Sequence, residues 1–572
     1  MEARTLLFPK GNKAITAVVV TFFLAGVVLL SWFWKSKGGE WDLTNVERPW
    51  QDGVSIYSHI SEHISPDANG LQEGGSRLPD EVDDGGIKWA AGAMDGAFGH
   101  HGGGGTEKTR AKLLHRALKV VLEDASSGKV KKLYGQLLQE GVLDFIDPLL
   151  VHIVERHDLD AERLEELAVW LAKNAPDREP VKFAIAILGI TQGSDNSALL
   201  LTLGRHEEFT LYSAVALSNT AGAGAEKMLF ELGQHVDGWG RISIVERLAD
   251  TTDPEIKSWM LREGYRNSIM YEYLAYTCAV AGGLRAELEK KTVDPEILDG
   301  AADIIQALVT GGPAENMDDY ADGAVVSERF VYHLGEEPRG IGQLIGVDYI
   351  QRFLDEKEAD WTARESRGWT QELRNALGKR VAEIKALPHW NEVVGAGLAS
   401  EDRTVFGEAD IAAKAIGLDT WDHHFRRLES GIDDGWYYVM QTDDANRIDR
   451  VITLAEQTLP LDEIATGPAE EIGLGLEWAN HSHLDFVLQD LRRFPGKGWQ
   501  LIRTGVGSPV IRNRHMALRA LSPWGIANWP EGAEKLLRVS LAEEPDEEVR
   551  REIETLLAGN EIEEPQIHFD AE

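Results

Sequence analysis

An apolar segment of helical character recurs along the middle of this chain, and this repeat constrains the fold more than any other feature. Residues 180–188, 209–217 and 240–248 can be aligned with one another. Residues 269–277 form a looser copy, and successive copies begin about 30 residues apart. One pair of short helices cannot bury its apolar face alone, whereas stacked neighbouring pairs can. The period therefore predicts an all-α fold, an α-solenoid of helical hairpins.

The aligned copies also predict which side chains lie between neighbouring repeats. Leu217 and Leu248 occupy the same position of two copies, on the apolar stripe of a helix. Glu246 falls on the other side of that helix. Because residues three and four apart share one face of a helix, we expect both leucines to be buried and Glu246 to be exposed.

Two C-terminal segments carry a more specific pattern. Residues 508–512 (Ser-Pro-Val-Ile-Arg) continue into 517–521, and residues 545–550 (Pro-Asp-Glu-Glu-Val-Arg) continue into Leu556 and Leu557. The Ile-Arg and Val-Arg pairs are 38 residues apart. A Pro or Asp before the helix, then Val-Arg, then small residues and Leu on the packing face, resembles the second helix of a HEAT repeat. Membership of the HEAT and armadillo-like repeats implies a scaffold or binding surface, and it transfers no catalytic residue to this chain.

An uncharged apolar stretch near the N-terminus has the length of a membrane span. Residues 14–34 contain no charged side chain, and Lys13 and Lys35 flank them. About 20 apolar residues are enough to cross a bilayer as a helix. The aromatic residues at the far end of the stretch favour the membrane interface. The sequence therefore predicts an uncleaved transmembrane helix at 14–34.

The charges on the two sides of this stretch differ slightly in number. Arg4, Lys10 and Lys13 precede it, together with the amino terminus, whereas Lys35 and Lys37 follow it. Loops that carry more Lys and Arg stay in the cytoplasm. We therefore expect a single-pass protein with a cytoplasmic N-terminus and an extracytoplasmic body.

Composition changes divide the chain further. Gly and Asp are frequent before residue 105, and the helical period is interrupted between residues 311 and 400. An apolar island at 87–98 inside the Gly-rich stretch has the character of a small lid or latch. The predicted segments are a short N-terminal tail at 1–13, the transmembrane helix at 14–34, a Gly/Asp-rich tether at 35–105, N-terminal helical repeats at 106–310, an irregular helical region at 311–410, C-terminal HEAT-like repeats at 411–560 and an acidic tail at 561–572.

The net charge of −37 limits the partners of this chain. Nucleic acid binding requires phosphates to be neutralised by Lys and Arg, so we expect no nucleic acid partner. Basic proteins and cations fit such a surface, and the excess charge can also serve solubility alone. Cys278 is the only cysteine, which excludes an intrachain disulfide. It lies in an apolar helical run, typical of a buried, inert thiol.

The pattern His59-Ile-Ser-Glu62-His63 matches the H-x-x-E-H signature of some zinc proteases. On a helix the two histidines would lie one turn apart and could share a zinc ion, with Glu62 as general base. The Gly-rich surroundings favour a solvated amphipathic turn instead. His59, Glu62 and His63 are the candidate metal ligands, and the sequence indicates neither a catalytic residue nor a site for an organic cofactor.

Repeats without a catalytic pattern favour a scaffold. We expect a membrane-tethered helical-repeat protein that binds a protein or peptide partner and has no catalytic activity. The alternative is a membrane-anchored enzyme, such as a metal-dependent hydrolase, whose site is assembled from dispersed His, Asp and Glu residues between positions 311 and 445.

Overall fold

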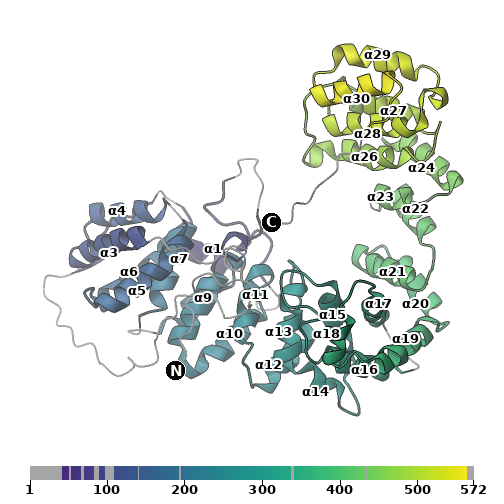
Figure 1. Cartoon of the computed structure of the whole chain (residues 1–572). Helices are drawn as coiled ribbons and strands as arrows, with labels where there is room; N and C mark the ends of the chain where they lie inside the picture. Colours follow the sequence, from purple (N-terminus) through teal and green to yellow (C-terminus); the bar gives the residue numbers. More distant parts are fainter. Residues whose placement is uncertain are drawn as a thin grey trace. The chain divides into compact units, whose positions relative to one another are not determined.

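The computed structural model describes residues 41–562 apart from 51–52, 66–69, 83–88, 97–107, 140, 192–194, 336–339 and 433. These residues divide into two compact units, Met1–Leu387 and Pro388–Glu572 (Figure 1). The described residues contain helices and two isolated β-bridges but no strand. The predicted all-α fold is therefore confirmed.

The helices of the first unit are short and follow one another closely. Their bounds are α1 Ile56–His63, α3 Lys108–Glu123, α4 Ser127–Leu137, α5 Ile146–Arg156, α6 Ala161–Asn174, α7 Arg178–Leu188, α8 Ser197–Gly204, α9 Glu207–Thr220, α10 Ala225–Gly233, α11 Gly238–Arg247, α12 Pro254–Trp259, α13 Glu272–Gly282, α14 Leu284–Leu288, α15 Pro295–Thr310, α16 Gly323–Leu334, α17 Ile341–Asp355, α18 Trp361–Ser366 and α19 Gln371–Lys385.

Aspartate residues start several of these helices. The carboxylate of Asp160 accepts the N–H of Arg163, and Asp253 and Asp294 accept the first free N–H groups of α12 and α15. These two are each followed by a proline at the first helical position, where its missing N–H costs nothing. Local capping therefore sets where these three helices begin.

Alternate helices of the first unit form a continuous row. α7 packs on α9, α9 on α11, α11 on α13, α13 on α15, α15 on α17 and α17 on α19. α8 and α10 pack against α9 and α11 from the other side, as one member of each hairpin. Figure 1 shows α7, α9, α11 and α13 following one another in this unit. The region 311–410 was predicted to be irregular, yet its helices α17 and α19 continue the row.

The register predicted from the aligned copies is partly confirmed. Leu217 and Leu248 are both buried, as expected for positions between neighbouring repeats. Glu246 is half-buried rather than exposed, and burial raises its pKa to about 7. The two-sided picture of that helix is wrong because α11 has neighbours on more than one face.

The second unit repeats the same packing logic. Its helices are α20 Trp390–Leu398, α21 Arg403–Ala415, α22 Trp421–Glu429, α23 Trp436–Met440, α24 Ala445–Thr458, α25 Leu461–Ile464, α26 Ala479–Leu491, α27 Trp499–Val506, α28 Ile511–Leu521, α29 Ala533–Glu543 and α30 Glu547–Leu557. α26 packs on α28 and α28 on α30, while α27 and α29 pack against α28 and α30.

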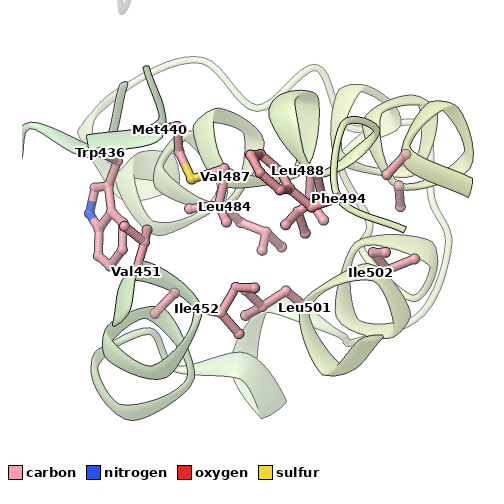
Figure 2. Close-up of a cluster of buried hydrophobic side chains, with 14 of the residues drawn as sticks. Trp436, Met440, Val451, Ile452, Leu484, Val487, Leu488, Phe494, Leu501 and Ile502 are labelled. Carbon is pink, nitrogen blue, oxygen red and sulfur yellow. The ribbon is translucent and has the colours of Figure 1, made fainter. Parts of the chain in front are cut away.

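One apolar core joins helices of the second unit. Figure 2 shows Leu484 and Leu488 pointing toward side chains such as Leu501 and Ile502. Beside this core lies a fully buried ion pair, in which Arg514 Nη2 is 2.8 Å from Glu544 Oε1. A buried cation is tolerated here because its Nη1 also donates to the carbonyl oxygens of Ser508 and Pro509.

The predicted membrane span at 14–34 lies outside the described residues, as does most of the predicted acidic tail. In the part of the chain that the structure describes, none of the helices has the length and apolar composition needed to cross a bilayer.

The described parts of the predicted tether pack against the repeats. Ile56 and Ile60, one turn apart on α1, are fully buried, and Leu78 is almost fully buried. The indole N–H of Trp41 donates to the carbonyl of Val121 at 3.0 Å, and α1 packs on α6 and α8. Where the Gly-rich composition predicted a free tether, these residues are a structural part of the first unit.

Candidate functional site

The starts of three neighbouring helices form a polar surface in the first unit, which we call the cradle. The cradle comprises residues 177–182 of α7, 206–212 of α9 and 237–239 of α11, with the cap residue of each helix included. The first N–H groups of a helix lack partners within it and carry partial positive charge. Residues 70–82 and 89–96, which we call the docked segment, lie against these helix starts.

An aspartate of the docked segment is bound at the start of α7. Asp80 Oδ2 accepts hydrogen bonds from the backbone N–H of Arg178 at 2.8 Å and from its Nε at 3.0 Å. Asp80 Oδ1 accepts a third from Arg178 Nη2 at 3.1 Å. A fork-shaped guanidinium and a helix N-terminus thus hold one carboxylate together, which is a strong arrangement.

A lysine is buried one helical turn further along α7. Lys182 is only 3% exposed, and its Nζ is 2.6 Å from Asp95 Oδ2 and 2.6 Å from Glu208 Oε1. Glu179 Oε1 lies at 3.4 Å. Burial alone would lower the pKa of Lys182, but the charges of Asp95 and Glu208 outweigh it and hold the pKa above its ordinary value. The lysine is therefore charged and is matched by carboxylates.

Glu208 of α9 connects the cradle to the backbone of the docked segment. Its Oε2 accepts the N–H of Gly92 at 2.9 Å, and its Oε1 lies 3.7 Å from Arg178 Nη1. Burial would raise the pKa of Glu208, but Lys182 and these donors lower it to about 2. Glu208 is thus a carboxylate at any physiological pH, shared between both cations of α7.

His206, the cap residue of α9, caps its helix with one ring nitrogen and binds the docked segment with the other. Nδ1 accepts the N–H of Glu208 at 3.2 Å, which places the ring hydrogen on Nε2. Nε2 then donates to the carbonyl of Ser76 at 3.1 Å. Burial lowers the pKa of His206, which keeps the ring neutral in this role.

Two glycines let the docked segment approach the cradle closely. Gly92 has a φ of +70°, and a Cβ there would lie 2.6 Å from the carbonyl oxygen of Glu207. A Cβ on Gly96 would lie 2.6 Å from the ring of Trp239 at the start of α11. The glycine content that suggested flexibility is needed here for close contact.

Large apolar side chains of the docked segment point to solvent rather than into the cradle. Val82 is 78% exposed, Trp89 70% and Met94 50%, whereas Leu78 and Ala93 are buried. The segment is therefore held chiefly by two carboxylates, backbone hydrogen bonds and two smaller apolar residues. The cradle therefore binds the charges and the backbone of the docked segment, and not a large apolar side chain.

The predicted metal ligands lie on α1, beside the docked segment. The rings of His59 and His63 are 4.4 Å apart between centroids, as the helical spacing predicted. His59 Nε2 is 3.2 Å from the carbonyl oxygen of Gly75, and His63 Nδ1 is 2.7 Å from that of His59. Glu62 is exposed. Among the described residues there is no group of three or more His, Cys, Asp or Glu side chains placed to hold a metal ion.

Several His and Asp side chains of the second unit are engaged in structural contacts. His424 Nε2 lies 2.9 Å from Asp410 Oδ1, which also accepts the hydroxyl of Thr420 at 2.6 Å. His483 lies 3.5 Å from Asp434, and Asp443 pairs with Arg493 at 2.6 Å. His100 and His101 lie outside the described residues.

The sequence did not reveal the cradle residues Arg178, Lys182 and Glu208, or their partners Asp80 and Asp95. One signal was present: Lys182 stands between Val181 and Phe183 in an otherwise apolar copy of the repeat. A lysine in a buried run requires carboxylate partners. The distance in sequence to Asp80 and Asp95 hid which ones they are.

Comparison of the chain with models of protein families, with curated proteins and with solved structures found no match.

Proposed function

We propose that this protein is a membrane-tethered, non-catalytic scaffold of HEAT-like repeats that binds a segment of a protein partner in the cradle. One observation carries the proposal: the helix starts of α7, α9 and α11 already bind a piece of polypeptide that is rich in turns, the docked segment. Its contacts are ion pairs and hydrogen bonds to its backbone, which a segment of another chain can also make.

The HEAT-like assignment rests on the C-terminal repeats. The two segments that resemble the second HEAT helix fold as α28 and α30, and these two helices pack on each other. Each also packs on the helix before it, α27 or α29. Stacked hairpins of this kind present long surfaces for binding proteins.

Residues 14–34 would anchor the scaffold, with its body outside the cytoplasm. Protease added to intact cells should then remove the body, while alkaline carbonate should leave the chain in the membrane fraction. Complete protection from protease would contradict the proposed orientation, and extraction by carbonate would contradict the proposed membrane anchor.

Binding in the cradle can be tested in the full chain, purified in detergent micelles. In an opened variant, residues 70–96 are replaced by a Gly-Ser linker of the same length. A fluorescent peptide with the sequence of residues 70–96 is then titrated into the opened variant and into the intact chain, with fluorescence anisotropy as the readout. A scrambled peptide of identical composition is the control.

We expect the peptide to bind the opened variant and the scrambled peptide to bind much more weakly. A tethered competitor acts at an effective concentration in the millimolar range, so the intact chain should bind the peptide at least about tenfold more weakly than the opened variant. Absence of binding by an opened variant that retains its helical circular dichroism would refute the proposed function.

A further inference from the structure

The hydrogen-bond donors on α7 indicate which chemical groups a partner must carry. The ammonium group of Lys182 has three N–H donors in a buried position. The repeats themselves supply two carboxylates, Glu208 at 2.6 Å and Glu179 at 3.4 Å. The third carboxylate, that of Asp95, comes from the docked segment at 2.6 Å. The repeats alone therefore supply two of the three carboxylates around Lys182.

Tyr212 strengthens the preference for a carboxylate at this position. Its ring lies 5.7 Å from Lys182 Nζ, and its hydroxyl is buried near Asp95. Burial, followed by the charge of Asp95, holds the pKa of Tyr212 well above its ordinary value. Because the phenol of Tyr212 stays neutral, it does not balance the charge of Lys182. The position of Asp95 therefore suits a negatively charged acceptor.

A second carboxylate position lies one turn away on the same helix. Arg178 and Lys182 are four residues apart on α7, which places them on one face with a separation of about 6 Å. Arg178 and the free N–H at the helix start bind Asp80 through three hydrogen bonds. Among the described residues of the repeats, the carboxylate paired with Arg178 is that of Glu208, at 3.7 Å. The guanidinium fork is therefore satisfied by the docked segment and not by the repeats.

We infer that the cradle recognises a polypeptide that brings two carboxylates about one helical turn apart, one to Arg178 and one to Lys182. The docked segment is the internal ligand of this site, with Asp80 and Asp95 in the two positions. A partner must displace it and must match its acidic pair. This inference rests on the proposed function and adds the chemical class of the partner.

The test uses the opened variant of the full chain and four peptides covering residues 70–96: the native sequence, Asp80→Asn, Asp95→Asn and Glu73→Gln. Glu73 is exposed and serves as a control with the same loss of charge. We expect each asparagine peptide to bind at least tenfold more weakly than the native peptide, and the Glu73→Gln peptide to bind within about twofold of it.

The chain-side variant Lys182→Met should bind the native and Asp95→Asn peptides equally weakly, because the contact they differ in has gone. If this variant does not fold, the peptide series alone decides. Equal affinities for the native, Asp80→Asn and Asp95→Asn peptides would overturn the inference while leaving the proposed function intact. If Asp80→Asn, Asp95→Asn and Glu73→Gln weakened binding equally, the effect would come from the total charge of the peptide. That result would also overturn the inference. No binding of the native peptide would instead refute the proposed function.

Discussion

Replacing Lys182 by Met removes the charge at the centre of the cradle and keeps most of the apolar volume of the side chain. Asp95 and Glu179 would then lose their cation at a largely buried site, and Glu208 would keep only Arg178, at 3.7 Å. Removing one member of a buried ion pair typically costs about 3–5 kcal/mol. Undocking relieves this cost by returning Asp95 to water, so the loss should appear as local opening of the docked segment rather than as global unfolding.

Hydrogen exchange followed by mass spectrometry measures this opening directly. A cost of 3–5 kcal/mol corresponds to a roughly 100-fold to several-thousand-fold increase in the opening constant. We therefore expect the amides of residues 89–96 to lose most of their protection in the Lys182→Met chain. Lys173→Met, at an exposed position of α6, is the matched control and should leave exchange unchanged. Unchanged protection of residues 89–96 in the Lys182→Met chain would refute the reasoning.

Three further predictions concern the repeats. Leu217→Ala and Leu248→Ala should each cost about 2–5 kcal/mol, because each leaves a cavity in a packed site; urea unfolding of the full chain measures this, and effects below 0.5 kcal/mol would contradict the register. Burial, followed by the charge of Asp237, raises the pKa of Glu207 from 4.5 to about 7, so its contribution to stability is largest below pH 4.5 and is lost as the pH rises to about 7. Glu207→Gln should remove about 3 kcal/mol of that pH dependence, and identical melting profiles of variant and wild type from pH 4.5 to 7.5 would exclude it. Arg514→Met should lower the free energy of unfolding by about 3–5 kcal/mol, because it leaves Glu544 buried without its cation. Hydrogen exchange in α28 and α30 should become faster, and unchanged exchange there would contradict this prediction.

The repeat period could be predicted from sequence because it arises from local, regularly spaced apolar residues. Leu217 and Leu248 are examples, since each lies at a helical interval from other apolar residues of its own copy. Their burial follows from the period alone. Glu246 was placed incorrectly because a helix in the middle of an array has more than one buried face.

The cradle could not be predicted because its partners are far apart in sequence. About 100 residues separate Asp80 from Arg178, and 87 separate Asp95 from Lys182. Glycine misled the interpretation as well: the Gly-rich composition of 35–105 suggested a flexible tether. Gly92 and Gly96, within the island expected to be a lid or latch, are instead required for close approach to Glu207 and Trp239. A glycine-rich composition shows where side chains are missing, but it does not show which atoms of the fold lie beside those glycines.

The most direct test of the central claim is competition inside the intact chain. A ¹⁵N-labelled peptide of residues 70–96 is added to the wild-type full chain, and exchange of the chain's own residues 89–96 is followed at increasing peptide concentration. The isotope mass separates the two copies of the sequence. The chain's own segment should lose protection over the same concentration range in which the peptide becomes bound. Binding of the peptide while the chain's own segment remains fully protected would show that the two do not share the cradle, and would contradict the account.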